Sequence, residues 1–193
     1  MVNNIEIIRN KLKFDKFGEF YYISIIQRSK DGILVKGAHD NARRIRTFYV
    51  FSLDEFDRII PFITEICDKL GARAYIEMNR KNIFKCQLEC IRRLLEGIEH
   101  QTLKSRTLMD SVVAAAPSRD KLWLIDVDAP EALEEAINYI EKEKATYYII
   151  PSVNGKHIIT SKFDSREWYF ENAEIKRNAF TLLYYNDISS KQE

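Results

Sequence analysis

Two aspartates close a short apolar segment in the second half of the chain. Asp126 and Asp128 follow the apolar residues 122–125, with Val127 between them. Side chains at positions i and i+2 of a strand point to the same face, so we expect the two carboxylates side by side. An ionised carboxylate in a buried strand is costly unless it is paired or binds a metal. The pattern therefore predicts a divalent metal site formed by Asp126 and Asp128.

A structural explanation of the same residues stays open. The strand could end in water, with Asp128 capping a helix that begins near Pro130. On this segment alone, the capping role and the metal site have equal weight.

The elements around this segment predict a ferredoxin-like sheet. Apolar patterns and turn residues predict the order β-α-β-β-α-β, with elements at 121–127, 130–144, 146–151, 156–161, 165–173 and 179–185. In that arrangement the first and third strands are antiparallel neighbours, so the end of one lies beside the start of the other. Lys156 and His157 open the third strand. Sequence order alone therefore predicts that the two carboxylates, the histidine and the lysine meet at one end of one sheet.

This set of groups suits metal-assisted phosphoryl transfer. Carboxylates hold Mg²⁺ or Mn²⁺, and such an ion neutralises charge that develops on nucleotide phosphates. His157 and Lys156 would donate hydrogen bonds to a triphosphate. The turn at Asn154 and Gly155 would let the backbone come close to a ligand. We therefore expect these four residues to bind the nucleotide.

Basic side chains in the first half are further candidates for phosphate contacts. Three of them lie on or just after a strand predicted at 72–78: Arg73, Arg80 and Lys81. A polar loop predicted at 37–46 carries three more: Arg43, Arg44 and Arg46. Solvated surface charge is the alternative for each of these residues. Arg80 is the one we assign to nucleotide binding.

The two motifs resemble those of the archaeo-eukaryotic primase (primase-polymerase) superfamily. Leu-Trp-Leu-Ile-Asp126-Val-Asp128 is similar to its hydrophobic-Asp-hydrophobic-Asp motif, and Ser152-Val-Asn-Gly-Lys-His157 resembles its second motif, which ends in a nucleotide-binding His. The layout matches over roughly residues 45–187. The resemblance implies an RRM-like catalytic half preceded by an α/β half. It also implies metal binding by Asp126 and Asp128 and nucleotide contact by His157.

Two positions depart from the pattern of that superfamily. Gly155 stands where the family usually has Ser. The candidate for the family's third carboxylate is Asp187, after the strand at 179–185. In the predicted sheet that strand runs antiparallel to the first, which puts Asp187 at the end opposite Asp128. Without a third ligand, polymerisation itself would be in question.

The resemblance implies a metal-dependent nucleotidyltransferase that acts on nucleoside triphosphates and a nucleic-acid template. Single-stranded nucleic acid and a replication protein would then be its partners. The alternative is a catalytically inactive RRM-like module that binds nucleic acid or protein, with four tyrosines free to stack on bases: Tyr147, Tyr148, Tyr184 and Tyr185. A phosphatase of the haloacid dehalogenase type is a third, weaker reading, because Pro130 stands where that motif has Thr or Val.

Composition and the remaining sequence patterns bear on the fold class, the location of the protein and the state of its cysteines. The chain has 193 residues, of which 46% are hydrophobic and 31% charged, with a net charge of +1, so no global field draws it to nucleic acid or membrane. We expect an α+β fold in which an α/β module at 1–117 packs with an RRM-like half at 118–193. No membrane span or signal peptide is apparent, which predicts a cytoplasmic protein without membrane contact. The three cysteines are expected to be reduced and buried: Cys67, Cys86 and Cys90.

The first half also predicts its own strands and helices. Strands are expected at 19–28, 33–35, 47–51 and 72–78, and helices at 52–71, 82–99 and 103–116. Ser52 and Glu55 form the pattern of a capping box at the start of the first helix, and Gly71 is suited to end it.

Overall fold

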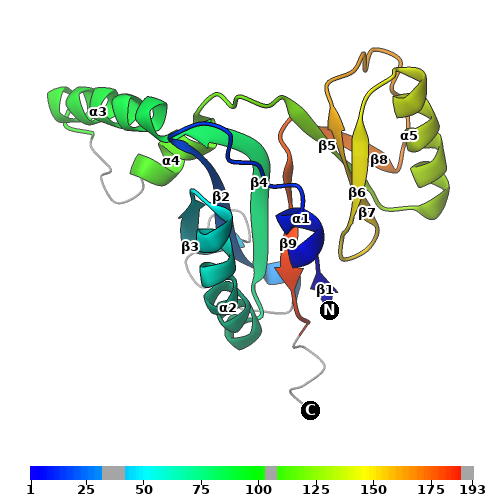
Figure 1. Cartoon of the computed structure of the whole chain (residues 1–193), viewed down its shortest axis with the longest axis horizontal. Coiled ribbons are helices and arrows are strands. Elements are labelled where there is room, and N and C mark those ends of the chain that lie inside the picture. The colour runs from blue at the N-terminus through cyan, green and yellow to red at the C-terminus, as the bar shows by residue number, and fades with distance from the viewer. Residues whose placement is uncertain (32–41, 103–107, 188–193) are drawn as a thin grey trace.

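Two antiparallel β-sheets organise the chain, and the computed structural model describes residues 1–31, 42–102 and 108–187 (Figure 1). Sheet A has the strand order β1-β9-β4-β2-β3, and sheet B has the order β6-β7-β5-β8. Five α-helices accompany them in the described part of the chain. The predicted α+β class is therefore confirmed.

Sheet A combines the strands of the first half with the last strand of the chain. Its members are β1 (Val2–Asn3), β2 (Glu19–Arg28), β3 (Ala42–Val50), β4 (Arg73–Asn82) and β9 (Phe180–Tyr185). A short 3₁₀ turn, η1 (Ser29–Asp31), follows β2. Helices α1 (Ile5–Arg9) and α2 (Leu53–Leu70) contribute apolar side chains to its core, among them Ile8, Phe56, Ile63 and Cys67.

The capping signals at both ends of α2 are present. The Ser52 hydroxyl accepts a hydrogen bond from the Glu55 backbone N–H at 3.1 Å, and the Glu55 carboxylate accepts one from the Phe51 N–H at 2.9 Å. Gly71 has φ of 56°, the left-handed conformation that glycine adopts without strain. These local bonds explain why the helix boundaries could be predicted.

Helices α3 (Ile83–Glu99) and α4 (Leu108–Ala115) pack on each other at the end of the molecule away from sheet B (Figure 1). Asn82 caps α3 by accepting a hydrogen bond from the Lys85 N–H at 3.1 Å. A small core joins these helices to sheet A and contains Phe20, Cys86, Val112 and Val113.

Sheet B lies beside sheet A and shares a core with it. Its strands are β5 (Leu122–Val127), β6 (Tyr147–Pro151), β7 (Lys156–Ser161) and β8 (Ala173–Lys176), and α5 (Pro130–Lys142) covers one face. The other face brings Leu124, Ile150 and Ile159 into the core of sheet A. Two asparagines fix the junction. Asn79 exchanges hydrogen bonds with the backbone of Leu122 at 2.8 and 2.9 Å, and Asn4 donates to the carbonyls of Pro151 and Leu182, each at 2.8 Å.

The predicted ferredoxin-like arrangement is wrong about one helix and about the position of one strand. Residues 165–173 form no helix, because their rings pack into an aromatic cluster in which Trp168 contacts Tyr139 and Phe170, and the Trp168 indole N–H donates to the carbonyl of Ala173. The strand β8 takes the place beside β5. The strand predicted at 179–185 is β9, and it pairs with β4 and β1 in sheet A. The predicted boundary at 117 falls between α4 and β5, but β9 returns to the first sheet.

The structure tests some of the remaining predictions, and others fall on residues that it does not describe. The strand predicted at 33–35 and residues 37–41 of the polar loop lie outside the described residues. The rest of that loop belongs to β3, which begins at Ala42 and is longer than predicted. Cys67 and Cys86 are buried, Cys90 is half-buried, and all three are free thiols. Within the described ranges, the helices are too short or too polar to cross a membrane.

Candidate functional site

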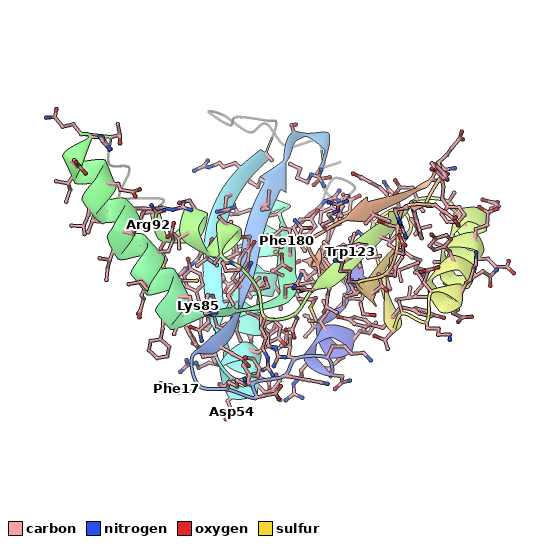
Figure 2. The ribbon with its side chains drawn as sticks, turned by 90° about the horizontal axis from the view of Figure 1, so that it is seen from above. Phe17, Asp54, Lys85, Arg92, Trp123 and Phe180 are labelled. Atoms are coloured by element: carbon pink, nitrogen blue, oxygen red, sulfur yellow. The ribbon has the colours of Figure 1, made fainter. Side chains whose placement is uncertain are left out.

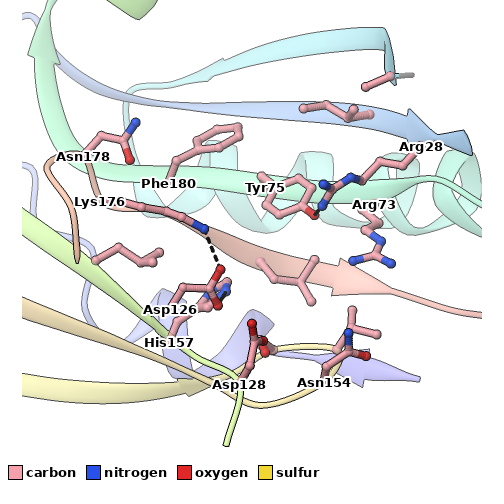
Figure 3. A pocket seen from close by; sticks show the side chains of 16 residues that line it. Arg28, Arg73, Tyr75, Asp126, Asp128, Asn154, His157, Lys176, Asn178 and Phe180 are labelled. Carbon is pink, nitrogen blue, oxygen red and sulfur yellow. Dashed lines mark hydrogen bonds and ion pairs between the residues drawn. The ribbon is translucent and has the colours of Figure 1, made fainter. Parts of the chain in front are cut away.

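A pocket of about 400 Å³ opens between the two sheets (Figure 3). Sheet B and the loop before β7 line one side with polar groups, which are Asp126, Asp128, Ser152, Asn154, His157 and Lys176. Sheet A lines the facing side with Arg28, Arg73, Tyr75, Phe180 and Leu182. The pocket thus sets an acidic edge opposite a basic and aromatic wall.

The alternation of β5 aims both aspartates into this pocket. Leu124, Asp126 and Asp128 line it, whereas the intervening side chains pack toward α5. Ala129, not Asp128, is the N-cap of α5, and that helix start has no side-chain capping bond. Figure 3 shows both carboxylates pointing into the pocket. The capping explanation for Asp128 is therefore wrong, and the shared face of the two acids is confirmed.

Each carboxylate oxygen of Asp126 has a nitrogen atom as its partner. The His157 Nε2 lies 3.3 Å from Oδ1, and the Lys176 Nζ lies 2.5 Å from Oδ2. The hydrogen bond with His157, followed by that with Lys176, holds the pKa of the Asp126 carboxyl well below its ordinary value, although partial burial opposes this shift. Asp126 is thus a fixed, ionised carboxylate at the pocket edge.

His157 is held by both sheets. It stands directly opposite Asp126 in the antiparallel register of β5 and β7, as the sequence predicted. Its Nδ1 lies 2.9 Å from the hydroxyl oxygen of Thr181 on β9, and both side chains are buried. The orientation of the imidazole therefore depends on sheet A as well as on its own strand.

The loop before β7 is shaped by Gly155. The Gly155 N–H donates to the Ser152 hydroxyl at 3.0 Å, and a Cβ on Gly155 would lie only 2.0 Å from the carbonyl oxygen of Val127. The absence of a side chain at Gly155 thus allows the loop to cross close to the end of β5. The sequence had predicted that this glycine would allow close approach to a ligand. Asn154 lines the pocket, but Lys156 does not and is exposed.

Lys176 is a site residue that sequence reasoning missed. It lies on β8 opposite Leu124, and its Nζ also approaches Glu174 at 3.4 Å. Burial disfavours its charged form, but Asp126 and Glu174 outweigh this effect and raise the Lys176 pKa. The alternation of Glu174 and Lys176 was a faint signal of a strand, but the sequence does not reveal the pairing with β5.

The wall from sheet A supplies positive charge and rings. Arg73 makes a two-pronged ion pair with Asp31, one bond of which is 2.8 Å, and its guanidinium lies 4.5 Å from the centre of the Tyr185 ring. Arg28 donates to the Tyr75 hydroxyl at 3.3 Å. Tyr75 also stacks on Phe180, with ring centres 5.3 Å apart. Arg73 is the one predicted basic contact of the first half that lines this pocket.

Arg80 and Lys81 do not reach the pocket. The Arg80 guanidinium is buried among three carboxylates, at 2.7 Å from Asp120, 2.8 Å from Asp15 and 3.2 Å from Glu19. Lys81 donates to the carbonyl of Ala116 at 2.6 Å. Both residues are buried within β4, so the assignment of Arg80 to nucleotide binding is not supported by its position.

The tyrosines proposed for base stacking are also placed elsewhere. Tyr184 and Tyr185 are buried, and Tyr148 packs against the core of sheet A. The Tyr147 hydroxyl donates a hydrogen bond to the Glu141 carboxylate on α5. Asp187, the predicted third carboxylate, follows β9 and is not among the residues that line the pocket. The pocket has Tyr75 and Phe180 instead.

No protein-family model, curated protein or solved structure matches this chain.

The donor set limits how a metal could be held. Among the residues that the structure describes, no group of three or more His, Cys, Asp or Glu side chains is placed to hold an ion. Asp126 and Asp128 provide two carboxylates, and the Lys176 ammonium engages one oxygen of Asp126. Mg²⁺ is commonly held by one or two carboxylates, with water and substrate phosphates as the other ligands. The residues thus fit Mg²⁺ or Mn²⁺ that arrives with phosphate, and they fit a bare ion poorly.

Proposed function

We propose that the pocket binds a nucleoside triphosphate together with Mg²⁺ or Mn²⁺, and that the protein is a nucleotidyltransferase resembling the primase-polymerases. The observation that carries this proposal is the placement of Asp126 and Asp128 side by side on the pocket face of β5, with Arg28 and Arg73 across from them. Single-stranded nucleic acid would be the template, and replication proteins are the expected partners.

Different groups around the pocket would contact the metal ion, the phosphates and the base. Asp126 and Asp128 would hold the ion, which supplies charge neutralisation at the transferring phosphoryl group. Arg28 and Lys176 would donate to phosphate oxygens, and the Tyr75–Phe180 pair offers a ring face to a base. A volume of about 400 Å³ lies within the range of small-molecule pockets.

Lys176 would make metal binding depend on nucleotide binding. Its ammonium neutralises Asp126 when phosphate is absent. Its side chain is 39% exposed, so it has room to turn toward an incoming triphosphate. Such a turn would free Oδ2 of Asp126 for coordination. Nucleotide and metal are therefore expected to bind together, not one after the other.

Binding of a fluorescent ATP analogue, followed by anisotropy with and without Mn²⁺, tests the proposal. The protein should bind the analogue in the presence of Mn²⁺, and Asp126→Asn and Asp128→Asn should each weaken binding at least about tenfold, the usual scale for loss of a charged ligand contact. Asp164→Asn is the matched control, because Asp164 lies outside this pocket and pairs with Arg166. Equal binding by all four proteins would rule out the assigned site.

Nucleotidyl transfer needs its own assay. A primed single-stranded template, labelled nucleoside triphosphates and Mn²⁺ should give extended product on a sequencing gel. Product should disappear with Asp126→Asn and remain with Asp164→Asn. Nucleotide binding without any product would leave a binding protein and not a transferase.

A non-catalytic nucleic-acid-binding module is the second candidate. Two observations favour it. Lys176 already neutralises Asp126, and no third carboxylate lines the pocket among the described residues. In that case a labelled single-stranded oligonucleotide should bind in EDTA, and Tyr75→Ala should weaken binding while Asp126→Asn leaves it unchanged.

A further inference from the structure

Helix α3 carries a stripe of five large apolar side chains that face solvent. Each is between 51% and 70% exposed: Phe84, Leu88, Ile91, Leu95 and Ile98. The opposite side of the helix is the one that packs inward, through Cys86 and Cys90 in the core shared with α4. The exposed stripe is therefore not the face that the fold itself uses.

The spacing of this stripe is that of a coiled-coil seam. Its members follow one another at intervals of four, three, four and three residues. A helix that packs on a globular core shows a broader apolar face, whereas a strict alternation of four and three places knobs for one partner helix. The stripe runs nearly the full length of α3.

We propose that α3 forms an antiparallel two-helix interface with α3 of a second copy of this chain. The charges beside the seam favour this occupant. Lys85 and Glu99 lie two heptads apart on the same flank, so an antiparallel two-fold pair sets Lys85 of each copy near Glu99 of the other. Arg92, near the middle of this flank, is paired within its own helix to Glu89 at 2.6 Å and also to Glu96.

The area on offer suits a dimer. At these exposed fractions each side chain presents roughly 100 Å². Phe17, which is 90% exposed and has its ring centre 5.6 Å from that of Phe84, extends the patch at one end. The total of roughly 600–700 Å² exceeds what monomers usually leave exposed and approaches the roughly 800 Å² that each partner contributes to a standard interface.

The interface would leave the pocket open. Helix α3 projects from the end of the molecule opposite sheet B, as Figures 1 and 2 both show, and Lys85 and Arg92 are seen along it in Figure 2. Two copies joined through α3 would carry their pockets on the outer sides. Self-association is thus independent of the proposed chemistry.

Sedimentation velocity over a range of protein concentrations tests the interface. The unaltered protein should sediment as a dimer at tens of micromolar, and the double variant Leu88→Glu/Leu95→Glu should sediment as a monomer. Phe62→Glu is the matched control, since Phe62 is 58% exposed on α2, and it should leave the dimer intact. A monomer at all concentrations up to about 100 μM, a range in which specific dimers normally form, would overturn the proposal.

Exchanging the charges of Lys85 and Glu99 distinguishes pairing with a second copy of this chain from binding of a different partner. Lys85→Glu and Glu99→Lys should each weaken the dimer about threefold to tenfold, because each change brings like charges together twice in a symmetric pair. The double variant Lys85→Glu/Glu99→Lys should recover the original dissociation constant. Failure to recover, with circular dichroism showing intact folding, would overturn the antiparallel arrangement.

Discussion

The Lys176 Nζ lies 2.5 Å from the Asp126 Oδ2, so the central carboxylate of the pocket has its counter-ion on the neighbouring strand. The register of β5 and β8 sets this contact, because Lys176 stands opposite Leu124, whose side chain also faces the pocket. The strand beside the aspartates thus presents a cation to Asp126 and not a third acid. If the site binds a metal as we propose, Lys176 and the ion would compete for this carboxylate oxygen.

Lys176→Met should allow metal binding without nucleotide. The change removes the ammonium that occupies Asp126 and leaves two carboxylates with less compensation, so their affinity for a divalent cation rises. Calorimetric titration with Mn²⁺ alone should then show one site in the variant and none in the original protein. Lys156→Met is the matched control, because Lys156 is exposed on β7 and does not line the pocket. Identical titrations for all three proteins would contradict the counter-ion role.

Asp126→Asn should change how stability responds to acid. The depressed pKa means that the folded state favours the ionised form, so the stabilisation is fully present above the ordinary value of 3.8. As pH falls below about 4, the unfolded chain takes up a proton that the folded chain still lacks, and the stabilisation is lost. The difference in unfolding free energy between the original protein and the variant should therefore shrink toward pH 2. Urea denaturation at a series of pH values measures it, and a difference that stays constant would refute the linkage.

Gly155→Ala should destabilise the protein by about 1–3 kcal/mol, the usual cost of overpacking. A Cβ would lie 2.0 Å from the Val127 carbonyl oxygen, so the loop must move off the end of β5. Chemical denaturation gives the free energy of unfolding. Asn154→Ala, in the same loop but exposed, should change stability by less than about 0.5 kcal/mol. An unchanged stability for Gly155→Ala would show that the loop has room to shift.

Arg80→Met should unfold the protein more easily without a specific effect on nucleotide binding. It leaves Glu19, which is buried, without one of its cations, and breaking a buried ion network costs about 3–5 kcal/mol. Arg119→Met is the matched control, because Arg119 also contacts Glu19 at 2.8 Å but is 42% exposed, and it should cost about 1 kcal/mol or less. A selective loss of nucleotide affinity in folded Arg80→Met would restore the role predicted from the sequence.

Local patterns allowed much of the fold and the centre of the site to be predicted. Ser52 and Asn82 accept the capping bonds that their positions indicated, and the β5 alternation places Asp126 and Asp128 as expected. His157 follows from topology alone, because antiparallel neighbours bring the end of one strand to the start of the other. Each of these features depends on residues close in sequence or on one simple pairing.

The remaining features depend on pairings that local patterns do not encode. Strand β9 pairs with β4 in sheet A, and its own residues do not indicate that partner. Lys176 reaches the site only because of the register in which β8 pairs with β5. The segment around Trp168 has apolar residues at helical intervals, but ring contacts with Tyr139 outweigh that tendency. Arg80 looked like a phosphate ligand because its three carboxylate partners are distant in sequence.

The position of β9 also has a consequence for the order in which the chain can fold during synthesis. Residues Phe180–Tyr185 complete sheet A between β1 and β4, and Thr181 holds His157. A ribosome makes the whole of sheet B before it reaches β9, so β4 emerges with one edge unpaired and stays so until then. Sheet B, whose four strands are consecutive in the chain, is free to form first. Sheet A, whose first strands are synthesised earliest, is therefore completed last. The pocket between the two sheets forms in the same step.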